Sequence, residues 1–179
     1  TRAAGSITLP SRFMLVGAMN PCRCGWYGHP SGRCRCTKQQ VEKYVEKISG
    51  PMLDRMDLHV NVPSVEFEAM RRREKAESSA DVRARVNKAR ERQKERFAGT
   101  DVACNAQMTP AMVGEYCALD AAGEKLLKGA FDRLGLTARS HDRLLRVART
   151  IADLDGSEKI EAHHLAEAIQ YRNTDILQG

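Results

Sequence analysis

Four cysteines near the start of the chain have the spacing of a metal site. Two Cys-x-Cys pairs, Cys22/Cys24 and Cys34/Cys36, frame a loop that is rich in glycine and proline. Four thiolates can enclose a tetrahedral zinc ion, and a loop with so few apolar residues gains order from such a link. The pattern predicts a structural zinc site, with His29 as a substitute ligand and an unmetallated loop of reduced cysteines as the alternatives.

A second candidate is Arg55, which stands between the carboxylates of Asp54 and Asp57. A Gly-Pro turn precedes it, and apolar and polar residues alternate over residues 56–62, which predicts a strand with one buried face. An arginine at the start of such a strand is either one half of a structural ion pair or a cation directed at a group outside the subunit.

Asn20 is a third candidate because it follows the longest apolar run, residues 13–19. A continuous apolar run bounded by prolines predicts a parallel strand buried on both faces. Asn20 would then lie at the carboxyl end of the strand, where open α/β sheets bind ligands. The simpler interpretation is a turn asparagine before proline.

Helices are predicted to position these residues. Thr37 and Gln40 form a capping box for a helix that leads from the cysteine loop towards Arg55. Ser78 or Ser79 begins a long helix to Phe97 that has a thin apolar stripe. This helix is either a solvated helix laid across the domain or a rail for a phosphate backbone. Its basic residues are Arg83, Arg85, Lys88, Arg90, Arg92, Lys94 and Arg96.

Four short helices are predicted after residue 106, and they are expected to form a small bundle. Their starts lie at Thr109, at Asp120, near Arg139 and near Glu161. Arg139 falls in the first turn of the third of these helices. The helix dipole disfavours a cation there, unless a bound anion compensates for it.

Composition limits the class of protein. The chain has 179 residues, 42% hydrophobic and 29% charged, which is typical of a soluble globular protein. The longest apolar run is too short to cross a bilayer and no signal-peptide pattern opens the sequence, so a cytoplasmic protein without membrane contact is expected. A net charge of +6 permits a polyanionic partner such as DNA, although it could simply keep the surface soluble.

Several segments resemble one family in the same order along the chain. Residues 48–58, Ile-Ser-Gly-Pro-Met-Leu-Asp-Arg-Met-Asp-Leu, resemble the Leu-Leu-Asp-Arg-Phe-Asp-Leu segment of magnesium-chelatase-like AAA+ ATPases. Residues 13–22, 144–154 and 164–172 are similar to the competence-type ComM/YifB branch of that family. The resemblance covers nearly the whole chain.

The resemblance implies a fold that is α/β first and all-α afterwards. Residues 1–63 would be the C-terminal part of an AAA+ α/β core, with a sensor-1 strand, an arginine-finger strand and the Cys-rich loop 22–36. Residues 64–100 would be a basic helical connection, and residues 101–179 a helical lid that carries sensor 2. Residues 6–8 would belong to a hairpin that points into the pore of a ring.

The resemblance also implies roles for single residues. Asn20 matches sensor 1, which orients the attacking water, and Arg55 matches the arginine finger that enters the site of the adjacent subunit. Arg139 matches sensor 2, the lid arginine that contacts the nucleotide phosphates, with Arg143 and Arg146 as competitors.

The implied function is a hexameric DNA branch-migration motor, built of identical subunits and driven by ATP and Mg²⁺. The chain has no Gly-x-x-x-x-Gly-Lys-Ser/Thr motif and no strand that ends in paired acids. We therefore expect the phosphate-binding loop and the magnesium-binding acid to lie before Thr1, and the chain by itself should not hydrolyse ATP. The alternatives are the ATPase subunit of a magnesium chelatase and a non-enzymatic, zinc-bearing interaction module.

Overall fold

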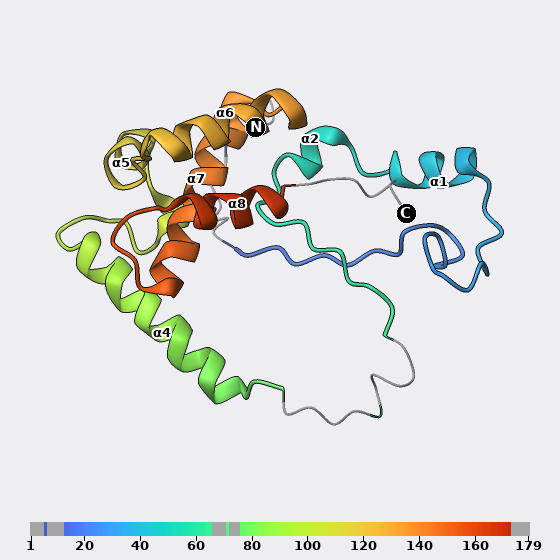
Figure 1. Cartoon of the computed structure of the whole chain (residues 1–179), viewed down its shortest axis with the longest axis horizontal. Helices are drawn as coiled ribbons and strands as arrows, with labels where there is room; N and C mark the ends of the chain where they lie inside the picture. The colour runs from blue at the N-terminus through green and yellow to red at the C-terminus, as the bar shows by residue number, and fades with distance from the viewer. Residues whose placement is uncertain (1–5, 7–12, 66–70, 72–75, 173–179) are drawn as a thin grey trace. The chain divides into compact units, whose positions relative to one another are not determined.

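The computed structural model describes residues 6, 13–65, 71 and 76–172. The chain divides into two compact units, with the boundary between Val45 and Glu46. The described elements are the helices α1 (Lys38–Val45), α2 (Gly50–Leu53), α4 (Ser79–Arg96), η1 (Asn105–Gln107), α5 (Pro110–Tyr116), α6 (Ala121–Leu134), α7 (Ala138–Asp155) and α8 (Ala162–Gln170) (Figure 1).

The predicted α/β core is wrong for the described residues, which contain helices and no strand. In the apolar run, Phe13, Met14 and Val16 are 76%, 89% and 81% exposed, and their backbone is not paired into a sheet. Val60 and Val62 in the second predicted strand are 66% and 82% exposed. A strand needs a neighbour to satisfy its backbone N–H and C=O groups, and no described segment supplies one. The predicted strand at residues 6–8 lies almost entirely outside the described residues.

The capping box before α1 is confirmed. The backbone N–H of Thr37 donates to Gln40 Oε1 at 3.0 Å, and the N–H of Gln40 donates to Thr37 Oγ1 at 3.3 Å. Val41 is the buried residue of this short helix. The two reciprocal bonds satisfy donors that the first turn of a helix otherwise leaves unpaired, so the helix start follows from local sequence alone.

Helix α4 also begins where the sequence predicts, because Ser78 Oγ accepts the N–H of Asp81. Ala89, Gln93 and Phe97 are its buried side chains, at spacings of four residues that place them on one face. This face packs against α7 (Figure 1). The rest of α4 is largely exposed.

The helices from α5 to α8 bury one apolar core. Helix α7 packs against α8, α4, α5 and η1, and α6 packs against α8 (Figure 1). The central side chains of the core come from α7 and α8: Leu144, Leu145, Ala148, Ala152, Leu165, Ala168 and Ile169. The predicted bundle of helices is thus built on apolar residues that recur at helical spacing along α7.

Helices α5 and α6 begin at the residues that the sequence predicted. Thr109 caps α5, and Asp120 caps α6 through a 2.7 Å bond from the N–H of Gly123. Gly135 and Gly156 end α6 and α7 in the left-handed conformation, with φ of 59° and 85°, which costs glycine little. None of the described helices has both the length and the apolar character that a bilayer crossing requires.

Candidate functional site

The four predicted metal ligands lie together in the first unit. The sulfur atoms of Cys22, Cys24, Cys34 and Cys36 all lie within 4.8 Å of one another. Cys22 Sγ is 3.3 Å from Cys24 Sγ and 3.8 Å from Cys34 Sγ, and Cys24 Sγ is 3.6 Å from Cys34 Sγ. A tetrahedral zinc ion with Zn–S bonds of about 2.3 Å needs sulfur atoms about 3.8 Å apart. The spacing therefore fits a four-cysteine zinc site with little movement of the thiols.

The electrostatics of the cluster also suit a dication. The N–H of Trp26, which donates to Cys24, is the largest cause that lowers the pKa of the Cys24 thiol to about 6. The N–H of Cys36 lowers the pKa of Cys34, but burial and the neighbouring Cys24 and Cys22 outweigh it and raise that pKa to about 12. Without a metal, one thiolate thus opposes the ionisation of the next. A bound dication would stabilise all four thiolates together.

His29, the alternative ligand, has other contacts. Its Nδ1 accepts the N–H of Ser31 at 3.0 Å, and its ring meets Trp26 edge-on with the centroids 4.9 Å apart. The Arg33 guanidinium lies 5.1 Å from the centroid of the same Trp26 ring. His29 and Arg33 thus make a small cation–aromatic group with the tryptophan, next to the cysteines.

Asn20 is exposed and lies beside the cysteine loop. A Cβ atom placed on Gly25 would be 3.6 Å from Asn20 Nδ2, so the amide borders the turn that holds Cys22 and Cys24. Asn20 belongs to the first unit, whereas Arg55 and Arg139 belong to the second.

Arg55 is exposed at the end of the α2 turn. Its Nη1 donates to the carbonyl of Pro51 at 3.2 Å, within its own turn. No described carboxylate pairs with it, although Asp54 and Asp57 flank it in sequence. The interpretation of Arg55 as half of an internal ion pair therefore finds no support in the described part of the chain.

Two other arginines hold the carboxylates that flank Arg55. Arg172, whose side chain is 3% exposed, contacts Asp54 Oδ1 at 3.4 Å and donates to the carbonyl of Met56. Arg143 donates to Asp57 Oδ1 at 2.9 Å and to the carbonyl of Arg55 itself. The turn is thus fixed from the N-terminal part of α7 and the end of α8, and the Arg55 guanidinium is left for another partner.

The positioning role of Arg172 and Arg143 could not be predicted from the sequence. The one available signal was the pair of carboxylates around Arg55, since each needs a cation or water. The partners lie 118 and 86 residues away along the chain, so spacing could not identify them.

Arg139 lies in the first turn of α7, and its side chain is outside the described part of the structure. Thr137 caps this helix by accepting the N–H of Ser140 at 3.3 Å. The two competitors for the sensor-2 role are engaged elsewhere: Arg143 with Asp57, and Arg146 with the carbonyl of Met108 at 2.8 Å.

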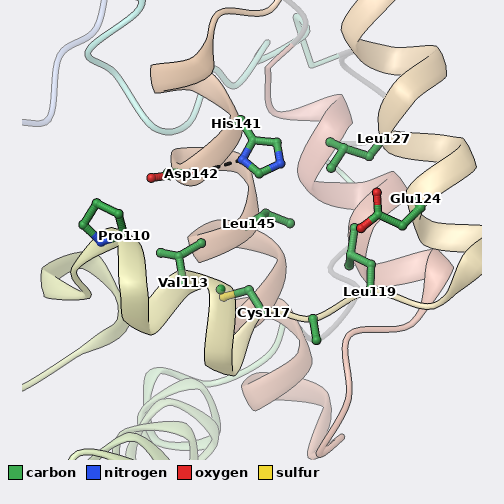
Figure 2. A pocket seen from close by; sticks show the side chains of 11 residues that line it. Pro110, Val113, Cys117, Leu119, Glu124, Leu127, His141, Asp142 and Leu145 are labelled. Carbon is green, nitrogen blue, oxygen red and sulfur yellow. Dashed lines mark hydrogen bonds and ion pairs between the residues drawn. The ribbon is translucent and has the colours of Figure 1, made fainter.

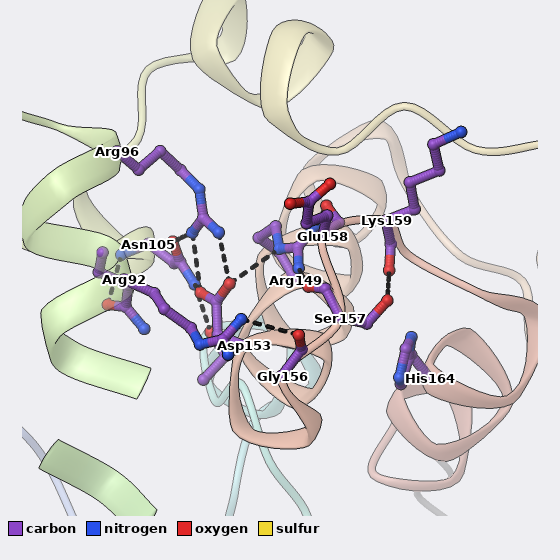
Figure 3. Close-up of polar contacts among 12 residues, drawn as sticks. Arg92, Arg96, Asn105, Arg149, Asp153, Gly156, Ser157, Glu158, Lys159 and His164 are labelled. Atoms are coloured by element: carbon purple, nitrogen blue, oxygen red, sulfur yellow. Dashed lines mark hydrogen bonds and ion pairs between the residues drawn. The ribbon is translucent and has the colours of Figure 1, made fainter. Parts of the chain in front are cut away.

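A buried polar network joins α4 to α7 (Figure 3). The side chain of Asp153 is fully buried; its Oδ1 accepts from Arg96 and from Arg149 at 3.2 Å, and its Oδ2 accepts from Asn105 at 2.8 Å. Arg149 also donates to the carbonyls of Ser157 and Glu158, at 2.6 and 2.7 Å. Every one of these contacts is internal, so this network stabilises the fold.

A cavity of about 290 Å³ lies beside α5, α6 and α7 (Figure 2). Cys117 is a potential nucleophile in its lining, but burial raises the pKa of this thiol to about 11. His141 at the rim pairs with its neighbour Asp142 at 3.1 Å. A thiol that stays protonated near neutral pH is a poor nucleophile, so Cys117 is not activated for nucleophilic chemistry in this cavity.

Asp155, His163 and His164 form a second group whose donor atoms lie within 4.8 Å of one another. His164 Nδ1 accepts the N–H of Glu161 at 2.9 Å, so its proton is on Nε2, which donates to Asp155 Oδ2 at 3.2 Å. A metal at Nε2 would require that proton to move to a nitrogen that already accepts a hydrogen bond. His164 instead forms the capping box of α8 together with Glu161, and both of its ring nitrogens are engaged in hydrogen bonds.

Comparisons with known proteins agree with the order of the segments along the chain. Residues 1–70 match the family described as "Magnesium chelatase, subunit ChlI", and residues 76–172 match "Magnesium chelatase, subunit ChlI C-terminal". The chain is 40% identical to protein YifB of Escherichia coli over 178 residues, which is 99% of this chain and 34% of that protein. It is 40% identical to competence protein ComM of Haemophilus influenzae over 173 residues, 96% of this chain and 33% of that protein. The chain therefore spans about a third of the length of these relatives.

Proposed function

Since this chain belongs to the magnesium-chelatase ChlI family, we propose that it is part of an ATP-dependent AAA+ motor. The chain contains no Gly-x-x-x-x-Gly-Lys-Ser/Thr motif and spans a third of its relatives, so the phosphate-binding loop would belong to the remainder of the motor. The chain would contribute three polar side chains and a zinc-binding loop.

The environment of Arg55 is the observation that carries this proposal. An exposed guanidinium whose flanking carboxylates are held by Arg172 and Arg143 is available to an anion outside its own subunit. In phosphoryl transfer, an arginine supplied by a neighbour stabilises the charge that develops on the γ-phosphate and raises the rate about 10³- to 10⁵-fold. Arg55 would have this role across a subunit boundary.

Two further residues would complete the nucleotide site. Asn20 would orient the attacking water through its amide. Arg139, at the N-terminus of α7, would contact the phosphates of the nucleotide bound to its own subunit; the helix dipole favours an anion there. Engagement of Arg143 and Arg146 in internal contacts supports the choice of Arg139.

The cysteine loop would hold a structural zinc ion through Cys22, Cys24, Cys34 and Cys36. Such an ion supplies a rigid link between two parts of a loop that lacks an apolar core. It would fix the turn beside which Asn20 lies. Its role is therefore in shape and not in phosphoryl transfer.

The substrate that we propose is DNA, moved by a hexameric ring of identical subunits during branch migration. The name of the Haemophilus influenzae relative, competence protein, favours this substrate, and the net charge of +6 is compatible with it. The family name favours a second candidate, the ATPase subunit of a magnesium chelatase, which would act on a porphyrin together with partner subunits.

One experiment tests the motor and its substrate together. ATP hydrolysis by the parent-length protein is measured alone, with four-way DNA, and with porphyrin plus partner subunit, for the wild type and for Arg55→Ala. The substitution Arg133→Ala, at an exposed arginine of α6, is the matched control. We expect stimulation by four-way DNA, its loss in Arg55→Ala and full activity in Arg133→Ala.

Other results would contradict the proposal in distinct ways. Stimulation by porphyrin and not by DNA would favour the chelatase. Absence of nucleotide affinity in the parent protein would favour a non-enzymatic, zinc-bearing interaction module. Full activity in Arg55→Ala would remove the proposed role of that arginine.

A further inference from the structure

Helix α4 has a row of cations along one exposed face. Arg83, Asn87, Arg90 and Lys94 follow one another at spacings of four, three and four residues, which places them on a single side of the helix. All four side chains are exposed. We call this set the α4 stripe.

The cations of the α4 stripe differ from the other basic residues of the helix in their contacts. Arg85 forms an ion pair with Glu77 at 2.5 Å, Arg92 donates to the carbonyl of Gly156 at 2.8 Å, and Arg96 is bound to Asp153. No described carboxylate pairs with any cation of the α4 stripe. Its charge is therefore available to a partner.

The carboxylates of α4 lie on a different side of the helix from the stripe. Each residue of a helix is rotated by about 100° from the one before it. The mean direction of the three carboxylates therefore lies roughly a third of a turn around the helix axis from the α4 stripe; they are Asp81, Glu91 and Glu95. Lys88 falls among these acids, and it also lines a cavity of about 480 Å³ that includes Asp81 and Asp155. The stripe is thus a cationic surface, whereas the Lys88 side carries mixed charge.

The stripe lacks the features of a membrane-binding helix. The apolar side of α4 packs on α7 through Ala89 and Phe97, and the exposed apolar residues next to it are two valines, Val82 and Val86, at 37% and 43% exposure. An interfacial helix needs a broad apolar face with large side chains. A soluble polyanion is therefore a better partner for the stripe than a membrane surface is.

We propose that the α4 stripe binds the phosphodiester backbone of nucleic acid without reading its sequence. From Arg83 to Lys94 the stripe extends about 16 Å along the helix axis, which corresponds to about five phosphates of one duplex strand at about 3.4 Å per charge. Asn87, between the cations, adds an amide donor of the kind that contacts phosphate oxygens. This assignment rests on the proposed DNA function and names the residues that hold the DNA.

The test is direct binding of the full chain to fluorescein-labelled DNA, single-stranded or duplex, followed by anisotropy without nucleotide. Arg83→Gln/Arg90→Gln removes two charges from the stripe, and Arg85→Gln/Lys88→Gln removes two charges from other sides of the same helix. Circular dichroism of both variants checks that α4 remains folded.

At about 0.15 M salt, we expect Arg83→Gln/Arg90→Gln to bind DNA about 10- to 30-fold more weakly than the wild type does. The control, Arg85→Gln/Lys88→Gln, should lose less than about threefold in affinity. Between about 50 and 200 mM salt, the slope of log K against log salt should fall by about 1.8 for duplex DNA or about 1.4 for single strands. The stripe binds whichever form of DNA, single-stranded or duplex, loses more affinity for the variant Arg83→Gln/Arg90→Gln.

Two results would overturn the inference. If both double variants lose equal affinity, net charge and not the stripe binds DNA, and the motor function stands on its own test with Arg55→Ala. If the wild-type chain binds neither form of DNA even at low salt, the stripe has no such role, and DNA-stimulated ATP hydrolysis then decides the proposed function separately.

Discussion

Substitution of Asp153 tests how α4 is joined to α7. This carboxylate is fully buried and accepts hydrogen bonds from Arg96, Arg149 and Asn105. In Asp153→Asn, an NH2 group replaces one oxygen and must face either a guanidinium or the amide of Asn105, and all of these groups are donors. Arg149, whose side chain is 2% exposed, then stays buried without a counter-charge.

The expected loss in the free energy of unfolding follows from the burial of the two arginines that remain. Removal of one partner from a buried ion pair costs about 3–5 kcal/mol. Arg96 is partly exposed, at 16%, so water can compensate part of its lost interaction and the lower value, about 3 kcal/mol, applies. For a unit that runs from residue 46 to residue 176, such a loss lowers Tm by roughly 9–18 °C.

The assay is urea unfolding of the full chain followed by far-UV circular dichroism, together with a thermal scan. Asp132→Asn, at an exposed position of α6, is the matched control and should change the free energy of unfolding by less than about 0.5 kcal/mol. A loss below about 1 kcal/mol in Asp153→Asn would refute the reasoning, because the network would then contribute no more than surface contacts do.

Two further predictions concern acid and metal. Burial raises the pKa of Asp153, but the hydrogen bonds from Arg96 outweigh it and hold that pKa below its ordinary value. The stabilisation is therefore present above about pH 4 and lost as the pH falls through the lower folded-state pKa. The free energy of unfolding of the wild type should therefore approach that of Asp153→Asn as the pH falls below about 4; a difference between the two proteins that does not change with pH would contradict this. Elemental analysis should find one zinc ion per chain, lost with chelator or in Cys22→Ser, while the helical signal of the second unit persists; a zinc-free wild type purified without chelator would contradict this.

The features that the sequence predicted correctly depend on neighbours a few residues away. The caps by Thr37, Ser78, Thr109 and Asp120 each bond to a backbone N–H three residues later, so residue type and spacing determine them. The helix α7 could also be predicted, because an apolar period of about 3.6 residues indicates a helix regardless of which neighbour covers its apolar face.

The strands were predicted incorrectly because a strand is a property of a pair of segments. The apolar run at residues 13–19 and the alternation at residues 56–62 both have strand patterns, but their backbone groups find no ladder partner among the described residues. The same limit applies to the candidate site. That Arg55 is exposed depends on Arg172 and Arg143 holding its flanking carboxylates, and these contacts join distant parts of the sequence.

The cysteine cluster was predictable at the level of residues and not at the level of electrostatics. Two Cys-x-Cys pairs indicated four ligands, and the described sulfur atoms do lie together. The contrast between Cys24 and Cys34, with pKa values of about 6 and about 12, depends on the backbone N–H groups that bond to Cys24 and on the burial and neighbouring thiols that act on Cys34. Only the folded loop provides these surroundings.

In the proposed motor, Arg55 acts on the nucleotide of a neighbouring subunit while Arg139 acts on the nucleotide of its own subunit. Mixing parent-length Arg55→Ala and Arg139→Ala subunits tests it most directly, since the first keeps an intact Arg139 and the second can lend Arg55 to its neighbour. Each variant alone should be inactive in ATP hydrolysis, and an equimolar mixture should recover about a quarter of the wild-type rate, the fraction of interfaces that random assembly into a ring restores. A mixture as inactive as its components would contradict the account.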